Sequence, residues 1–224
     1  MAAAQDFTPH LEVLPAPQLR LWRELGAVPD AFVLYGGTAI ALHLGHRSSI
    51  DFDFFADRRL DPTALAREVP FLKDAEVIQR EPNTLSVVVD RGGPVQVSFF
   101  GVPKLRRLRP PLLAPCTGVK IASLLDLAGT KASVVQLRAE AKDYLDIDAL
   151  ITLGGVGLAT ALAAARALYG TSFNPQITLK ALSYFGEGNL RRLAKAVKLR
   201  LSDAARQVDL DRLPVVMPER RRRP

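Results

Sequence analysis

The sequence is poor in residues that form covalent or metal cross-links. Its 224 residues include one cysteine, Cys116, and three histidines. A single cysteine excludes an intrachain disulfide, and so few cysteine and histidine ligands argue against a structural zinc site. This composition is typical of a reducing compartment, so we expect a cytoplasmic protein.

Long uncharged stretches are also scarce, and only one resembles a membrane span. Residues 149–165 carry no charge, and a stretch of about 17 residues is at the lower limit for crossing a bilayer. Gly154 and Gly157 interrupt it, and Asp148 and Arg166 flank it. We therefore predict the end of one buried helix, a glycine turn and the start of another helix. The N-terminal residues show no signal-peptide pattern, and we expect no membrane partner.

The composition fits neither a disordered chain nor a fibrous one, because 48% of the residues are hydrophobic and 24% are charged. The chain is long enough to bury a core. Basic residues outnumber acidic ones by 30 to 23, and Arg220–Arg223 with Glu219 supply three of the seven net positive charges. A mildly basic body suits a polyanionic partner such as a nucleotide or RNA.

Strand signals are confined to the first half of the chain. Apolar or alternating runs predict strands at residues 31–35, 50–55, 85–89 and 95–102, and helical patterns occupy residues 39–44 and 62–73. Beyond the prolines near residue 115 the pattern is helical. We therefore expect an α+β fold whose parts are a core with a small mixed sheet and a helical lead-in (residues 1–115), a helical region (116–212) and a basic, disordered tail (213–224).

Two glycines and two aspartates form the strongest local signal. Gly36 and Gly37 lie between a predicted strand and helix, where the backbone can approach an anion closely, and Thr38 is a candidate helix N-cap. Asp51 and Asp53 are two residues apart on a strand and therefore share a face. Adjacent carboxylates repel each other unless a cation separates them, and Mg²⁺ would also bring substrate phosphates. The alternative is the solvent face of an amphipathic strand.

This order of motifs resembles the nucleotidyltransferase fold shared with DNA polymerase β. Residues 34–55, with Gly-Gly-Thr and then His-Arg before Asp-Phe-Asp, are similar to the AbiEii/AbiGii toxin family of bacterial nucleotidyltransferases. Four later segments also resemble this family. These are Leu125–Lys131, Arg138–Asp146 with its Lys-Asp-x-x-Asp signature, Phe173–Pro175 and Leu182–Phe185. The resemblance spans about residues 30–190 in the expected order. It implies that Gly36, Gly37 and Thr38 cradle the triphosphate of the NTP and that Asp51 and Asp53 bind Mg²⁺.

The downstream motif predicts a cationic stripe. On one continuous helix, Lys131, Arg138 and Lys142 would lie within a narrow angular range, because successive residues turn by about 100°. Such a stripe could hold a triphosphate and neutralise the leaving pyrophosphate. The alternative is a solvated helix face with ordinary pairs such as Lys142 with Asp146. The resemblance favours nucleotide binding, in which Lys131 and Lys142 contact phosphates and Asp143 or Asp146 orients them or acts on the acceptor hydroxyl.

One feature of the polymerase-β-like pattern is missing. Such enzymes commonly bring a third carboxylate from a later strand, but the candidate strand here carries Gln96 and Ser98 at its polar positions. Substrate phosphates could still complete the coordination of a metal held by two carboxylates. Arg47 precedes the aspartate strand, and it is a candidate for contacting a nucleotide phosphate, for pairing with an aspartate or for a structural role in the loop.

We therefore predict a Mg²⁺-dependent enzyme that moves a nucleoside monophosphate from an NTP to an acceptor such as tRNA or another RNA. The resemblance implies a toxin of a toxin–antitoxin or phage-defence pair, with a separately encoded antitoxin protein as partner. Two alternatives stay open. One is a module that binds NTP or RNA without turnover, consistent with the missing acid, and the other is an enzyme that modifies a hydroxyl group of a protein.

Overall fold

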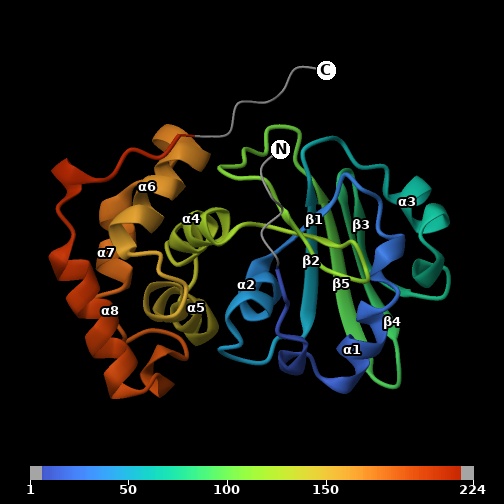
Figure 1. Cartoon of the computed structure of the whole chain (residues 1–224), viewed down its shortest axis with the longest axis horizontal. Helices are drawn as coiled ribbons and strands as arrows, with labels where there is room; N and C mark the ends of the chain where they lie inside the picture. Colours follow the sequence, from blue (N-terminus) through green and yellow to red (C-terminus); the bar gives the residue numbers. More distant parts are fainter. Residues whose placement is uncertain (1–6, 218–224) are drawn as a thin grey trace. The chain divides into compact units, whose positions relative to one another are not determined.

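The computed structural model describes residues 7–217, which form two compact units (Figure 1). The first unit contains the residues up to Arg106 together with Pro111–Ala122, and the second contains Arg107–Pro110 and the residues from Ser123 onward. The segment around residue 115, where we predicted a boundary, therefore belongs to the first unit. Most of the predicted basic tail, residues 218–224, lies outside the described residues.

The first unit is built on a mixed sheet of seven strands in the order β3-β4-β5-β2-β1-β7-β6, which confirms the predicted α+β fold. β2 runs parallel to β5, and β1 runs parallel to β7. The strands are β1 (Val33–Tyr35), β2 (Asp51–Ala56), β3 (Glu76–Glu81), β4 (Thr84–Asp90), β5 (Pro94–Gly101), β6 (Leu112–Leu113) and β7 (Lys120–Ile121). The helices are α1 (Ala16–Trp22), α2 (Gly36–Leu44) and α3 (Pro62–Glu68), with 3-10 turns at Leu11–Val13, Leu25–Ala27 and η3 (Pro70–Leu72).

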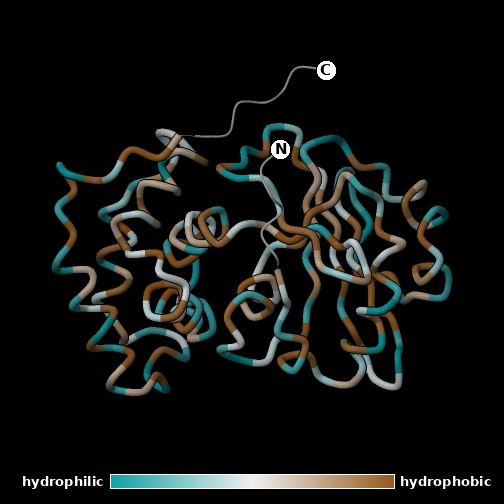
Figure 2. The backbone as a smooth tube through the Cα atoms, in the orientation of Figure 1, coloured by the Kyte–Doolittle hydropathy of each residue, from teal (hydrophilic) through white to brown (hydrophobic). Residues whose placement is uncertain are grey.

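Alternation along β2 explains how the sheet is buried on one face and polar on the other. Phe52 and Phe54 are at most 1% exposed. Phe54 stacks on Phe99 of β5 with ring centroids 5.3 Å apart, and Trp22 of α1 stacks on Phe52 at 6.3 Å. Figure 2 shows hydrophobic stretches along the strands, with hydrophilic residues frequent in the connecting loops. The period of two therefore leaves the side chains between these phenylalanines on the opposite face.

Three local expectations differ from the structure. Thr38 does not cap its helix, because α2 begins at Gly36 and Tyr35 is its N-cap residue. The helix predicted over residues 62–73 ends at Glu68, since Pro70 cannot continue a helical hydrogen-bond ladder, and η3 follows it. β3 was not predicted, because all six of its residues are exposed at the sheet edge and give no apolar alternation.

The second unit contains five α-helices among the described residues. They are α4 (Leu124–Val134), α5 (Ala141–Thr152), α6 (Leu158–Tyr169), α7 (Pro175–Ala181) and α8 (Lys195–Gln207), with 3-10 turns at Gly170–Ser172, Leu190–Arg192 and Leu210–Arg212. The uncharged stretch of residues 149–165 is divided between α5 and α6 by the predicted glycine turn. Within residues 7–217, no helix has the length and apolar character needed to cross a membrane.

Asp126 anchors the start of α4 to the short segment Arg107–Pro110. Its carboxylate accepts hydrogen bonds from the backbone N–H groups of Leu108 at 2.8 Å and Arg109 at 3.1 Å, and from the Ser123 hydroxyl at 2.6 Å. Burial raises the pKa of this carboxyl group despite these donors. The contacts explain why Arg107–Pro110 belongs to the helical unit although its neighbours in sequence do not.

Gly129 allows α4 and α6 to pack closely. A Cβ atom at this position would lie 2.9 Å from Leu168 Cδ1 and 3.0 Å from the backbone of Ala164 and Ala165. We expect Gly129→Ala to lower the free energy of unfolding by about 1–2 kcal/mol, because overpacking outweighs the higher helix propensity of alanine. Urea denaturation would measure this, with Gly157→Ala as the control because its Cβ would meet no atom within 4 Å. An unchanged or more stable Gly129→Ala protein would contradict the packing argument.

Candidate active site

The candidate site of the first unit is centred on two carboxylates of β2. Asp51 and Asp53 are half-buried and point to the face opposite Phe52 and Phe54. In the sheet, Asp53 is opposite Tyr35 of β1 on one side and Ser98 of β5 on the other. The sequence prediction that the two aspartates share one strand face is therefore consistent with the structure.

The first turn of α2 lies against the second of these carboxylates. Gly36 has φ +74°, and a Cβ atom built on it would be 2.7 Å from Asp53 Oδ2. The N–H groups of this turn belong to Gly36, Gly37 and Thr38, and the side chain of the N-cap residue Tyr35 makes no capping hydrogen bond to them. A helix N-terminus favours negative charge, so the turn can stabilise Asp53 and attract a further anion.

The side chain of Thr38 forms hydrogen bonds within the protein. Its side chain is buried, its hydroxyl donates to the Asp51 carbonyl, and Thr38 Oγ1 lies 2.7 Å from Ser49 Oγ. These contacts tie the first turn of α2 to the start of β2. Thr38 therefore fixes the position of the glycine turn relative to the two aspartates.

The sheet register shows which residues occupy the place of the missing third acid. Asp51 pairs with Gln96 and Asp53 pairs with Ser98 on the neighbouring strand β5, and Ser98 accepts a 3.1 Å hydrogen bond from Ser86 of β4. Within the described part of the chain, no group of three or more His, Cys, Asp or Glu side chains is arranged to hold a metal ion. Among the described residues, Asp51 and Asp53 are therefore not part of a larger cluster of this kind.

Other acids of the sheet do not fill that place. Glu76 is in the same cross-strand row as Asp51, but it lies three strands away, which corresponds to about 14 Å at the usual strand spacing. Asp90 accepts a hydrogen bond from the Gly93 N–H at 2.9 Å and so closes its own hairpin turn. Arg47, in the loop before β2, donates to the Ser48 carbonyl at 3.0 Å.

The second unit brings together most of the residues of the downstream motif in a buried ion-pair network. Lys131 Nζ lies 2.8 Å from a carboxylate oxygen of Asp143 and 2.8 Å from one of Asp146. The side chains of Asp143 and Asp146 are 0% exposed, and that of Lys131 is 7% exposed. Lys131 is therefore an ammonium group enclosed by two carboxylates.

Arg138 completes this network. Its Nε donates to Asp143 Oδ2 at 2.7 Å and its Nη2 donates to Asp143 Oδ1 at 3.1 Å, a two-point contact. Burial opposes ionisation of Asp143, but the hydrogen bonds from Arg138 and the charge of Lys131 outweigh it and hold its pKa below the ordinary value. The two cations and two carboxylates balance each other in charge.

The predicted cationic stripe is wrong. α4 ends at Val134 and α5 begins at Ala141, so Lys131 and Lys142 are on different helices, and Arg138 is in the turn between them. The turn brings Arg138 back to Asp143, an ion pair that helical periodicity could not show. Lys142 remains at the surface, 3.3 Å from Glu140.

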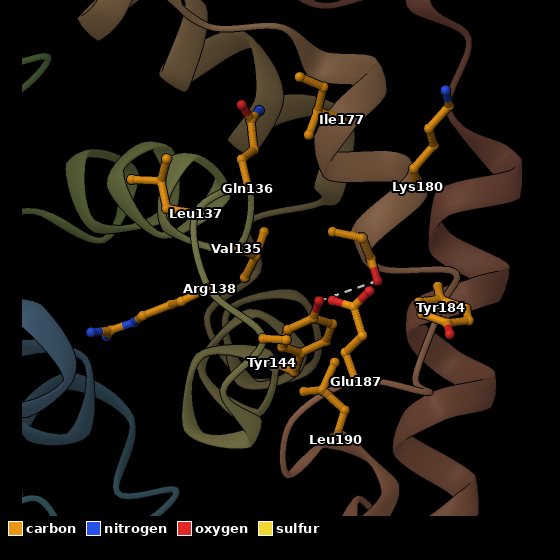
Figure 3. A pocket seen from close by; sticks show the side chains of 12 residues that line it. Val135, Gln136, Leu137, Arg138, Tyr144, Ile177, Lys180, Tyr184, Glu187 and Leu190 are labelled. Carbon is orange, nitrogen blue, oxygen red and sulfur yellow. Dashed lines mark hydrogen bonds between the residues drawn. The ribbon is translucent and has the colours of Figure 1, made fainter.

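A pocket of about 480 Å³ lies beside this turn in the second unit (Figure 3). Tyr144 closes one side, where its hydroxyl donates to the Ala181 carbonyl at 3.2 Å. The exposed side chains of Ile177 and Tyr184 line it together with Lys180 and Glu187, which carry opposite charges. The sequence analysis did not identify this pocket, because its lining comes from separate segments.

Comparisons with known proteins identify a family by sequence and a similar fold by structure. The sequence model of a family described as nucleotidyl transferase AbiEii toxin, type IV TA system, matches residues 20–214. An uncharacterized protein of Aquifex aeolicus (strain VF5), aq_aa25, is 30% identical over 163 residues, which cover 72% of this chain and 76% of that protein. The structure of MenT4, a nucleotidyltransferase toxin from Mycobacterium tuberculosis H37Rv, covers 86% of this chain and 84% of its own with a TM-score of 0.56 and 15% identity. That structural likeness supports the fold.

Proposed function

Because this chain belongs to the AbiEii family of nucleotidyltransferase toxins of type IV toxin–antitoxin systems, we propose that it catalyses Mg²⁺-dependent transfer of a nucleoside monophosphate. The donor is an NTP, the acceptor is a hydroxyl group of RNA such as tRNA, and pyrophosphate leaves. The observation that carries the proposal is the pair Asp51 and Asp53 on one strand face beside the first turn of α2.

The two carboxylates fit a magnesium ion. Mg²⁺ is commonly held by one or two carboxylates, with substrate phosphate oxygens and water completing its octahedron. Asp51 and Asp53 would hold it, and the bound ion would neutralise charge on the reacting phosphates. The absence of a third acid in the described residues makes the NTP itself part of the coordination shell. Metal binding and nucleotide binding are therefore expected to depend on each other.

Backbone and side-chain groups near the two aspartates would position the triphosphate. The N–H groups of Gly36 and Gly37 would donate to phosphate oxygens, and Thr38 holds their turn against β2. Arg47 is proposed as a further phosphate contact from the loop before β2.

In the helical unit, the ammonium of Lys131 has three N–H groups, of which Asp143 and Asp146 engage two. We propose that the third donates to a phosphate oxygen. Asp143, held by Arg138 and 0% exposed, would orient Lys131 and would not reach the acceptor hydroxyl, and the surface cation Lys142 would add to the attraction of phosphates. Arg138 is proposed as a positioning residue, since its guanidinium is committed to Asp143.

Gly36→Ala tests the positioning of Asp53. The new Cβ would meet Asp53 Oδ2 at 2.7 Å and would force an alanine to φ +74°. We expect at least a tenfold loss of nucleotidyl transfer, equivalent to about 1.4 kcal/mol in the barrier. The control is Gly118→Ala, which has the same backbone strain at φ +69° but meets no atom within 4 Å. Equal activity in the two variants would show that the contact with Asp53 is unimportant.

One observation favours a second candidate function. Gln96 and Ser98 stand beside the aspartates where a third carboxylate is expected, which suits a module that binds NTP or RNA without turnover. A labelling assay separates the candidates. Purified protein is incubated with Mg²⁺, each α-labelled NTP in turn, and either total tRNA or a protein extract. Label on RNA supports the proposed function, label on protein changes the acceptor, and NTP binding without label on either supports the module.

A further inference from the structure

A basic pocket lies on the first unit, away from the face that carries Asp51 and Asp53. It has a volume of about 250 Å³ and is lined by α3, by the segment from η3 to β3, and by β4. Its charged lining residues are Arg67, Lys73 and Arg80, and no acidic residue contributes to it. We refer to these three residues and their surroundings as the edge pocket, because β3 is the edge strand of the sheet.

The register of β3 explains how the edge pocket excludes acids. Arg80 pairs with Leu85, whose row continues to Phe99 and Phe54, so Arg80 is on the buried-phenylalanine face of the sheet. Glu76 and Glu81 pair in rows that lead to Asp51 and Phe55, on the opposite face. The register shift between Val77 and Gln79, together with alternation, thus places both acids of β3 on the face opposite Arg80.

The three cations of the edge pocket are not paired with other described residues. In the part of the chain that the structure describes, the side chains of Arg67, Lys73 and Arg80 make no hydrogen bond or ion pair. Two cations of α8 behave differently, since Arg200 pairs with Asp148 at 2.5 Å and Lys198 donates to the Arg191 carbonyl at 2.9 Å. The edge pocket therefore concentrates uncompensated positive charge.

Its size and lining restrict the ligand. Pockets that enclose a small molecule usually measure about 300–1,000 Å³, so this one suits a single anionic group rather than a whole NTP. It contains no aromatic residue on which a base could stack. Phosphates of a nucleic-acid backbone meet these requirements, and they bind through charge without reading the sequence.

We propose that the edge pocket binds backbone phosphates of the RNA acceptor, outside the candidate active site. This rests on the proposed function, in which RNA receives the nucleotide. The three cations are at positions 67, 73 and 80, so they form no charged run in the sequence and converge only in the fold. RNA held there would increase the affinity of the enzyme for its acceptor without taking part in the chemistry.

The test compares the triple variant Arg67→Gln, Lys73→Gln, Arg80→Gln with a control of equal charge change, Arg23→Gln, Arg166→Gln, Arg212→Gln, whose residues lie outside the edge pocket. Binding of labelled total tRNA is measured by fluorescence anisotropy without NTP over a range of salt concentrations. We expect the edge-pocket variant to bind about tenfold more weakly and to lose about 2 from the slope of log K against log salt, because each phosphate contact contributes about 0.7–0.9. The control should change little.

Two further measurements make the proposal falsifiable. In the transfer assay, the edge-pocket variant should show a raised KM for tRNA with unchanged kcat. In the wild-type protein, tRNA should protect Lys73 from acetylation but should leave Lys195 reactive. Equal losses in both triple variants, no loss in either, or an unprotected Lys73 would overturn the edge pocket as an RNA site. Absence of RNA labelling by the wild-type protein that still binds tRNA would instead overturn the proposed function, so the two failures are distinguishable.

Discussion

The double variant Asp51→Asn, Asp53→Asn is expected to lose nucleotidyl transfer by a factor on the order of 1,000, or about 4 kcal/mol in the barrier. Asparagine keeps the size and one oxygen of each side chain but removes both negative charges. Because Mg²⁺ requires charged oxygen ligands and no third acid supports it among the described residues, the metal and the triphosphate should both be held poorly. Initial rates of label incorporation measure the effect.

Stability measurements separate this role from a structural one. Added Mg²⁺ with NTP should raise the melting temperature of the wild type only, since a ligand that binds the folded state stabilises it.

The matched control is Asp30→Asn, Asp74→Asn, which removes two exposed carboxylates of the same unit. It should retain full activity. Residual transfer above about a tenth of the wild-type rate in the double variant would contradict the proposed metal site, because it corresponds to less than about 1.4 kcal/mol of lost transition-state stabilisation.

The features that the sequence predicted well are those set by short spacing. Alternation in residues 50–55 predicted β2 and the common face of Asp51 and Asp53, and the two glycines that begin α2 marked the turn beside them. Each of these depends on neighbours within a few residues, so local periodicity is sufficient. The lack of a third carboxylate on β5 could be predicted for the same reason, because Gln96 and Ser98 occupy the alternate positions that pair with Asp51 and Asp53.

The features that the sequence did not predict depend on tertiary contacts. No proline or glycine lies between Val134, where α4 ends, and Ala141, where α5 begins. Nothing in the local sequence therefore indicates that the helix breaks there. The break is accompanied by the contacts of Lys131 and Arg138 with Asp143, which only the fold reveals. The edge pocket was overlooked in the same way, because three separate segments supply its cations.

The buried network predicts the largest effect on stability. Lys131→Met removes the ammonium group between Asp143 and Asp146, two carboxylates that are 0% exposed. Breaking a buried ion pair by removing one partner typically costs about 3–5 kcal/mol, because the remaining charge stays desolvated. Urea denaturation at pH 7 should show this loss. Lys142→Met is the matched control, since among the described residues the ion pair of Lys142 is with Glu140 at the surface, and it should cost about 1 kcal/mol or less.

The pH dependence distinguishes this account from simple loss of packing. In the wild type the pKa of Asp143 is held below its ordinary value, so its contribution to stability is present above the unfolded-state pKa and is lost as the pH falls through the folded-state pKa. In Lys131→Met, burial without the ammonium should raise the pKa of a carboxyl group in the network above its unfolded-state value. Stability of the variant should then fall as the pH rises, the opposite direction. If the destabilisation were the same at pH 5 and pH 8, it would come from packing, and the charge of Lys131 would not be what the two carboxylates require.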